Sequence, residues 1–166
     1  FLDDSANYST GVHLIEKDAL GAGTGAPTGV AVNNNCYVGQ WKVTYIDAFN
    51  FTKSTPYSVN CESESTAIKQ YFNYNGSQYL PSRVDNFSMR WEKDLVVPAT
   101  TNYTFTGKGD DYVKVYLDGV QVLSVTYLEG NKTATVSIPA GTHKLKVEMT
   151  EGVSTGNIDF KYAPAP

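Results

Sequence analysis

The chain has 166 residues, which is enough for one domain with a substantial core. Hydrophobic residues make up 41 % of the sequence and aromatic residues 13 %, whereas charged residues reach only 18 %. The net charge of −4 argues against a specific nucleic-acid partner and leaves room for cations. No apolar run approaches the roughly 18 residues that a membrane-spanning helix needs. The totals therefore predict a globular protein rich in β-strands, with no membrane span.

The first residue, Phe1, is preceded by neither a Met nor a charged-then-apolar leader. Two explanations fit: a mature secreted chain whose signal peptide was removed, or an expression product begun at a chosen position. N-x-S/T sequons are more frequent than the roughly two that chance predicts, although chains rich in Asn and Thr also produce unused sequons. We expect an extracellular, secreted glycoprotein at the cell surface. The glycosylation candidates are Asn7, Asn50, Asn75, Asn86, Asn102 and Asn131.

The two cysteines, Cys36 and Cys61, do not have the spacing of a zinc site. Only two histidines, His13 and His143, are present to help bind a metal. In an extracellular chain we expect a disulfide, which would stabilise the fold by about 3 kcal/mol. The alternative is a pair of buried free thiols.

Residues 1–35 are predicted to form an N-terminal arm, and residues 36–166 a β-sandwich domain. The arm contains a short strand candidate at residues 10–16 and a flexible tether, rich in Gly, at residues 19–29. This strand could fold back onto its own sheet, or it could add to the edge of a neighbour's sheet. A head-to-tail contact of the second kind need not close and propagates a filament. We expect donation to a neighbour, and therefore a homopolymer.

From Cys36 onward, apolar and polar residues alternate in short segments separated by turns, which is typical of strands. Asp118-Gly119 predicts a two-residue hairpin turn. One short helix is expected at residues 63–72, with Ser63 or Ser65 as its cap. The expected strands cover residues 36–46, 87–97, 101–106, 112–117, 120–127, 133–138, 144–149 and 158–162. The fold class is all-β: an antiparallel β-sandwich or jelly roll with one short helix and an N-terminal arm.

The sequence lacks the motifs of common enzymes. It has no G-x-S-x-G nucleophile elbow and no H-E-x-x-H metal motif. Glu92 and Asp94 lie beside Arg90 and Lys93, which is typical of a solvated charged face and not of a glycosidase pair. We expect no enzymatic activity.

Asp110 and Asp111 are adjacent carboxylates, which raise each other's pKa. Gly107 and Gly109 allow the backbone to bend sharply, so that both carboxylates can face one cation. Ca²⁺ takes about six to eight oxygen ligands, and loops at one end of a sandwich cluster. We therefore expect calcium here, although a solvated acidic turn is the alternative. The further candidate metal ligands are Glu151 and Asn157 in a late loop, and Asp3 and Asp4 in the arm of a neighbouring subunit.

Two segments of the chain, N-Y-T-F-T-G-K-G-D-D-Y-V-K-V-Y-L-D-G and I-P-A-G-T-H-K-L-K-V-E, resemble the PA14 type of extracellular β-sandwich. The resemblance covers residues 87–162. In sugar-binding members it implies an Asp pair that holds calcium through a cis peptide, assisted by a late Asn; the matching residues are Asp110, Asp111 and Asn157. The sequence departs from the pattern at Tyr112, where Gly usually follows the pair, and at Tyr162, near where Trp often closes the domain.

The whole chain also resembles the subunits of archaeal cannulae, which are extracellular tubules that assemble with calcium. The F-L-D-D start, V-A-V-N-N-N-C and the Tyr-rich strands carry this resemblance. The main functional expectation is therefore an extracellular structural protein that self-assembles with calcium into a tubule or filament through strand donation. The alternative is a calcium-dependent carbohydrate-binding PA14-like adhesin module with glycan partners. The adhesin reading predicts exposed aromatic residues around the Asp pair, with Tyr112 as a candidate.

Overall fold

The computed structural model describes residues 31–32, 36–37, 39–63, 65–72 and 85–166. It divides the chain into residues 1–38 and residues 39–166. In the first unit, the short strands β1 (Ala31–Val32) and β2 (Cys36–Tyr37) pair antiparallel. The candidate donor strand at residues 10–16 and the tether lie outside the described residues. Strand donation and the boundary between arm and domain therefore stay predictions.

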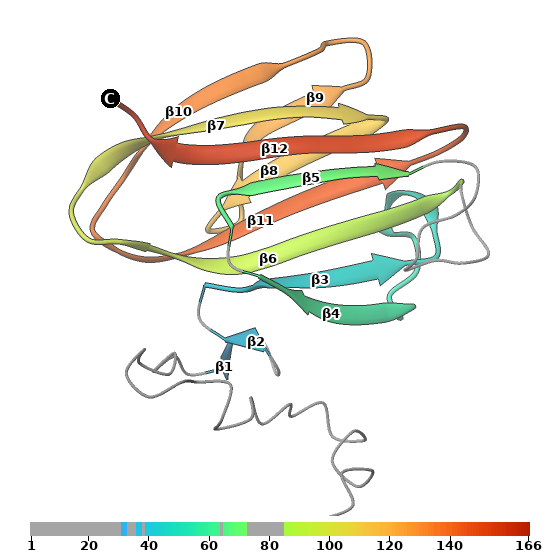
Figure 1. The fold of residues 1–166 in the computed structure, drawn as a ribbon, viewed down its shortest axis with the longest axis horizontal. Coiled ribbons are helices and arrows are strands. Elements are labelled where there is room, and N and C mark those ends of the chain that lie inside the picture. The colour runs from blue at the N-terminus through green and yellow to red at the C-terminus, as the bar shows by residue number, and fades with distance from the viewer. Residues whose placement is uncertain (1–30, 33–35, 38, 64, 73–84) are drawn as a thin grey trace, which may run out of the picture. The chain divides into compact units, whose positions relative to one another are not determined.

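The second unit is a sandwich of two antiparallel sheets (Figure 1). The six-stranded sheet, in the order β4-β3-β6-β11-β8-β9, consists of β3 (Trp41–Ile46), β4 (Ser58–Glu62), β6 (Phe87–Val97), β8 (Tyr112–Leu117), β9 (Val120–Thr126) and β11 (Gly141–Glu151). The four-stranded sheet, in the order β10-β7-β12-β5, consists of β5 (Ala67–Phe72), β7 (Thr101–Asp110), β10 (Lys132–Ile138) and β12 (Gly156–Pro164). The prediction of an all-β antiparallel sandwich is confirmed.

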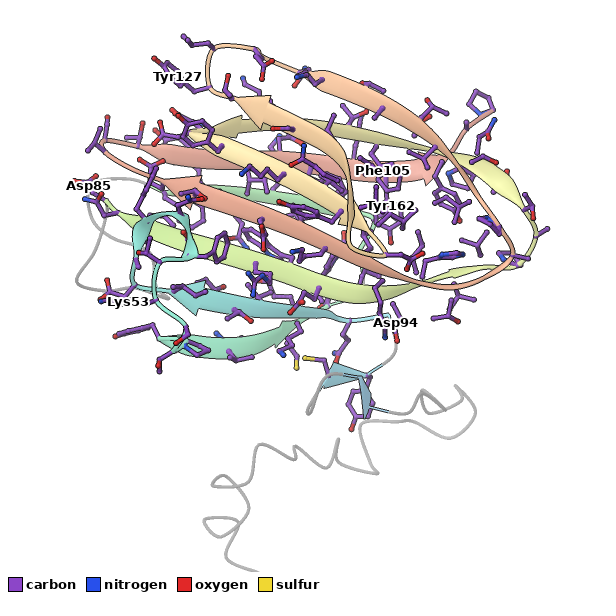
Figure 2. All side chains as sticks on the ribbon, turned by 180° about the vertical axis from the view of Figure 1, so that it is seen from behind. Lys53, Asp85, Asp94, Phe105, Tyr127 and Tyr162 are labelled. Atoms are coloured by element: carbon purple, nitrogen blue, oxygen red, sulfur yellow. The ribbon has the colours of Figure 1, made fainter. Side chains whose placement is uncertain are left out.

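The core lies between the two sheets. It is built from the apolar residues that alternate with polar ones along each strand and therefore share one face of the sheet. Figure 2 shows Phe105 and Tyr162 in this interior. Side chains with no measurable exposure include Val43, Tyr45, Met89, Trp91, Phe105, Val113, Val115, Val147, Met149 and Phe160. Burial of each large apolar side chain contributes about 1.5–3 kcal/mol, so this layer supplies the main driving force for the fold.

The helix expected at residues 63–72 is wrong, because this segment contains strand β5 at the edge of the four-stranded sheet. Ile68 and Phe72 are buried, but positions four residues apart share a face in a strand as well as in a helix. The Ser65 hydroxyl accepts a hydrogen bond from the Ala67 N–H at 3.0 Å, so it begins a strand and does not cap a helix. Backbone pairing with β12 favours the strand over the helix.

The Asp118-Gly119 turn between β8 and β9 is confirmed. Both residues have positive φ, 48° for Asp118 and 81° for Gly119, as a type I′ hairpin turn requires. In contrast, the charged segment before Leu95 is less solvated than the sequence indicates. Lys93 is only 4 % exposed and its Nζ lies 5.2 Å from the ring centroid of Trp41, while Asp94 is 9 % exposed and pairs with Lys144.

Candidate functional site

The ends of β5, β7 and β11 meet the start of β12 at one end of the sandwich, on the right in Figure 1. Asp110 is the last residue of β7, and a cis peptide bond joins it to Asp111. Tyr112 then begins β8 in the other sheet, so the chain crosses between the sheets at the Asp pair. Asn157 on β12 lies directly opposite Asp110 on β7. The fold thus brings together the three residues Asp110, Asp111 and Asn157.

Asp111 is held by backbone groups from three segments. Its Oδ2 accepts a hydrogen bond of 2.7 Å from the Gly152 N–H in the β11–β12 loop. Its own N–H donates to the Thr150 carbonyl at 3.3 Å, and its carbonyl accepts from the Tyr127 N–H at 2.9 Å. The carboxylate is therefore oriented before any ligand arrives, which lowers the entropy cost of binding one.

Asp110 carries the electrostatic signature of a carboxyl pair. Burial raises its pKa, and the negative charge of Asp111 and a hydrogen bond between the two carboxyl groups raise it further. A divalent cation bound between the two carboxylates would relieve this repulsion.

Glu151, the last residue of β11, is fully buried beside this pair. Neither of its carboxyl oxygens has a hydrogen-bond partner. Burial, followed by the charges of Asp111, Asp110 and Asp85, raises its pKa to about 8. At neutral pH the side chain is therefore mainly a neutral carboxylic acid, and its role as a direct metal ligand stays a prediction.

Asp85 belongs to the same end of the sandwich and was not found by sequence reasoning. Its Oδ1 accepts a hydrogen bond of 2.8 Å from the Ser154 N–H, while the Asn86 N–H donates to the Gly152 carbonyl at 2.9 Å. These bonds fasten the β11–β12 loop to the segment before β6. The contact joins residues that are far apart in sequence, so no local pattern signals it. Figure 2 shows Asp85 and Tyr127 at this end of the sandwich.

Exposed aromatic and apolar side chains surround the pair, as the adhesin reading predicts. Tyr112 is 43 % exposed and Tyr127 is 58 % exposed. Tyr71, which pairs with Asn157 across β5 and β12, is 67 % exposed. Val153 next to Gly152 is also exposed. Because aromatic side chains are usually buried, their grouping around two carboxylates is a feature of binding surfaces.

The candidate donors at this end of the sandwich are oxygen atoms, which hard cations such as calcium prefer. Within residues 31–32, 36–37, 39–63, 65–72 and 85–166, no group of three or more His, Cys, Asp and Glu side chains is arranged to hold a metal. Two carboxylates and one amide, Asp110, Asp111 and Asn157, are nevertheless hard oxygen donors, and calcium accepts carbonyl and ligand oxygens to complete its shell. Burial and the charge of Asp111 raise the pKa of Asp110, so a positive charge is favoured at this place. The residues present fit calcium.

The remaining predicted residues are the two cysteines, the arm residues, the sequon asparagines and the histidines. Cys36 and Cys61 are both disulfide-bonded, which confirms the predicted disulfide. Asp3, Asp4, Asn7, His13 and Asn75 lie outside the described residues. The structure describes four of the sequon residues, and all four are exposed: Asn50, Asn86, Asn102 and Asn131. Their exposure is compatible with glycosylation, which stays a prediction. His143 hydrogen-bonds Asp118 at 2.7 Å, at the far end of β8 from the Asp pair.

Residues 39–166 thus form an antiparallel β-sandwich module whose chain crosses between the sheets at a cis Asp-Asp bond, with an Asn directly opposite. The sequence matches the PA14 domain family over residues 42–163. The chain belongs to the PA14 domain family. No curated protein matches the chain. Among the residues that the structure describes, no helix is long and apolar enough to cross a membrane.

Several solved structures share this fold. An anti-sigma factor domain-containing protein from Clostridium clariflavum has a TM-score of 0.59 and 19 % identity, over 77 % of this chain and 43 % of that one. A beta-glucosidase from Kluyveromyces marxianus has a TM-score of 0.56 and 13 % identity, over 76 % of this chain but only 14 % of the enzyme. The chain thus spans less than half of either protein. The epithelial adhesin 9 A domain from Candida glabrata, in complex with Galb1-3GlcNAc, has a TM-score of 0.54 and 10 % identity, over 83 % of this chain and 86 % of that domain.

Proposed function

We propose that this protein is a calcium-dependent carbohydrate-binding module of an extracellular adhesin. The observation that carries the proposal is the cis-linked pair Asp110–Asp111, with Asn157 directly opposite on the neighbouring strand. In this proposal Asp110, Asp111 and Asn157 hold the calcium. The ion supplies positive charge and open coordination positions that sugar hydroxyl groups can fill.

The protein's own residues contribute orientation and selectivity. The Gly152 N–H holds one oxygen of Asp111 and so orients the carboxylate whose other oxygen would face the ion. Asn157 has a neutral amide, which adds an oxygen without adding charge to an already acidic site. The exposed rings of Tyr112 and Tyr127 offer apolar surface beside the ion. Sites of this kind combine a few placed polar groups with aromatic surface.

Binding without catalysis is the more economical proposal. Epithelial adhesin 9, whose A domain resembles this chain over most of its length, is described in complex with a disaccharide. The glycosidase neighbour resembles this chain over only a small share of its own length. The disulfide and the exposed sequons support an extracellular location, because disulfides persist in oxidising compartments.

A glycan array tests the proposal when it is probed once with calcium and once with EDTA. The calcium concentration should be about millimolar, which saturates weak extracellular sites. The array should include Galβ1-3GlcNAc and β-lactose. We expect binding to some glycans that disappears with EDTA and returns when calcium is added back. Binding that persists in EDTA, or no binding to any glycan, would contradict the proposal.

Assembly into a tubule or filament, and the likeness to cannula subunits, remain predictions without support from the described residues. Strand donation rests on the segment at residues 10–16 and the arm ligands on Asp3 and Asp4, which the structure does not describe. Light scattering after calcium addition, followed by electron microscopy, tests them. A protein that binds glycans and stays monomeric in calcium would leave the adhesin proposal standing alone.

A further inference from the structure

We infer that Tyr71 is a sugar-stacking residue, which binds the apolar face of a hexopyranose whose hydroxyl groups reach the calcium held by Asp110, Asp111 and Asn157. The inference rests on the proposed function and names the surface that would receive the sugar ring. Tyr71 lies in the segment that was expected to be a helix, so the sequence did not connect it with the Asp pair.

Three residues from three adjacent strands form one row across the four-stranded sheet. Tyr71 on β5 pairs with Asn157 on β12, and Asn157 pairs with Asp110 on β7. Directly paired residues project their side chains from the same face of a sheet. The neighbours Phe72, Ile158 and Gly109 are buried between the sheets, so the row Tyr71–Asn157–Asp110 faces outward.

The spacing of this row suits one sugar ring. Neighbouring strands lie about 4.8 Å apart, which places the backbone of Tyr71 about 10 Å from that of Asp110, with Asn157 halfway. A ring bound through its hydroxyl groups near Asp110 and Asn157 therefore extends over β12 toward β5. Tyr71 is the next side chain in that direction.

The chemistry of Tyr71 also suits a sugar. The residue is 67 % exposed, so its side chain is accessible to a ligand. Tyrosine combines an aromatic face, which packs against C–H groups, with a hydroxyl that can hydrogen-bond a sugar. Because β5 is the edge strand of its sheet, no further strand of the described sheet covers that side.

The row next to this one in the same sheet has a different character. Lys69 on β5 forms an ion pair with Asp159 on β12, with a distance of 3.5 Å, and Lys108 on β7 pairs with Asp159 in the register. These side chains are charged and hydrated, so they offer no apolar surface for the face of a sugar ring. On the outer face of these three strands near the Asp pair, Tyr71 alone supplies an aromatic ring.

The test compares three variants of the full chain on the same glycan array, probed with calcium. Tyr71→Ala removes the ring, and Tyr71→Phe keeps the ring without its hydroxyl. Tyr57→Ala removes an exposed Tyr that precedes β4, an edge strand of the other sheet. Terbium luminescence measures metal binding by each variant in the absence of any sugar. Thermal unfolding checks that each variant is folded.

We expect Tyr71→Ala to lower the affinity for bound glycans about five- to tenfold, and Tyr71→Phe to lower it less than about threefold. The terbium affinity of both Tyr71 variants should equal that of the wild type. The Tyr57→Ala variant should bind glycans with wild-type affinity. Unchanged glycan affinity of Tyr71→Ala, while the wild type binds in a calcium-dependent manner, would overturn the role of Tyr71 and leave the proposed function intact. A Tyr71→Ala variant that loses terbium affinity equally would assign Tyr71 to the integrity of the metal site and also overturn the inference. No glycan binding by the wild type would overturn the proposed function, and the inference with it.

Discussion

The backbone N–H of Gly152 donates a hydrogen bond of 2.7 Å to Oδ2 of Asp111. A Cβ atom at position 152 would lie 2.9 Å from that same oxygen. The loop between β11 and β12 therefore approaches the Asp pair so closely that a side chain at position 152 would force the Asp111 carboxylate to shift. This contact orients the carboxylate that we propose as a calcium ligand.

Gly152→Ala is expected to weaken calcium binding about tenfold, the usual effect of disturbing a group that orients a metal ligand. The backbone of Gly152 does not have positive φ, so the effect comes from the contact with Asp111 and not from backbone strain. Terbium luminescence or calorimetry measures the affinity. The neighbouring exposed Val153→Ala is the control and should bind like the wild type. Equal affinities for all three proteins would show that Gly152 does not orient a metal ligand.

The double substitution Asp110→Asn and Asp111→Asn should abolish calcium binding, because it removes both charges that attract the ion. Calcium at about 100 times its Kd should raise the unfolding free energy of the wild type by about 2.7 kcal/mol, and the variant should lose this gain. Thermal unfolding with and without calcium measures it. Asp159→Asn on β12, outside the pair, is the matched control. A calcium response that survives the double substitution would place the ion elsewhere.

Glu151 should make the stability of the calcium-free protein depend on pH. Its pKa is raised in the folded state from 4.5 to about 8. The folded state therefore holds this proton more tightly than the unfolded chain, so stability is complete below about 4.5 and declines as pH rises toward 8. Urea unfolding in EDTA at several pH values measures the slope.

Glu151→Gln keeps the shape of the side chain and removes its titratable carboxyl group. We therefore expect the unfolding free energy of this variant to change less between pH 5 and pH 8, the range over which the Glu151 pKa shift acts. Glu92→Gln changes a carboxylate on the outer face of β6 and should keep the slope of the wild type. If the Glu151→Gln protein shows the same decline as the wild type, the slope has another origin.

His143 and Asp118 should produce a second pH dependence at the other end of β8. The His143 ring is hydrogen-bonded by Asp118 at 2.7 Å and by the Pro139 carbonyl at 3.0 Å, and the Asp118 bond raises the pKa of His143. The hydrogen bond with His143, followed by that from the Lys144 N–H, lowers the pKa of Asp118. The contribution of His143 is therefore complete below pH 6.5 and is lost as pH rises through its raised pKa.

The contribution of Asp118 is complete above pH 3.8 and is lost as pH falls through its lowered pKa. His143→Gln should lower the melting temperature by about 2 °C at pH 5 and less at pH 8. Scanning calorimetry at both pH values measures the difference. A deficit of equal size at both pH values would mean that the charge of His143 does not stabilise the turn.

The amino-acid sequence determined the strands of the core and one turn. Alternation with a period of two placed Trp41, Val43 and Tyr45 inward because successive side chains of a strand point to opposite faces. The Asp118-Gly119 turn was predictable because positive φ at two successive positions is a local requirement. The adjacent acids Asp110 and Asp111 were visible as well, since a pair of neighbouring charges needs no tertiary contact to be recognised.

Only the tertiary structure decided between strand and helix for residues 67–72. Apolar residues four positions apart are compatible with both structures. The segment forms a strand because its backbone pairs with β12. The same pairing brings Tyr71 into a row with Asn157 and Asp110, which no local pattern could signal. Burial of Glu151 and the contact of Asp85 with Ser154 also depend on how distant segments meet. Local periodicity sets which face of a strand is apolar, whereas register and sheet order decide which side chains become neighbours.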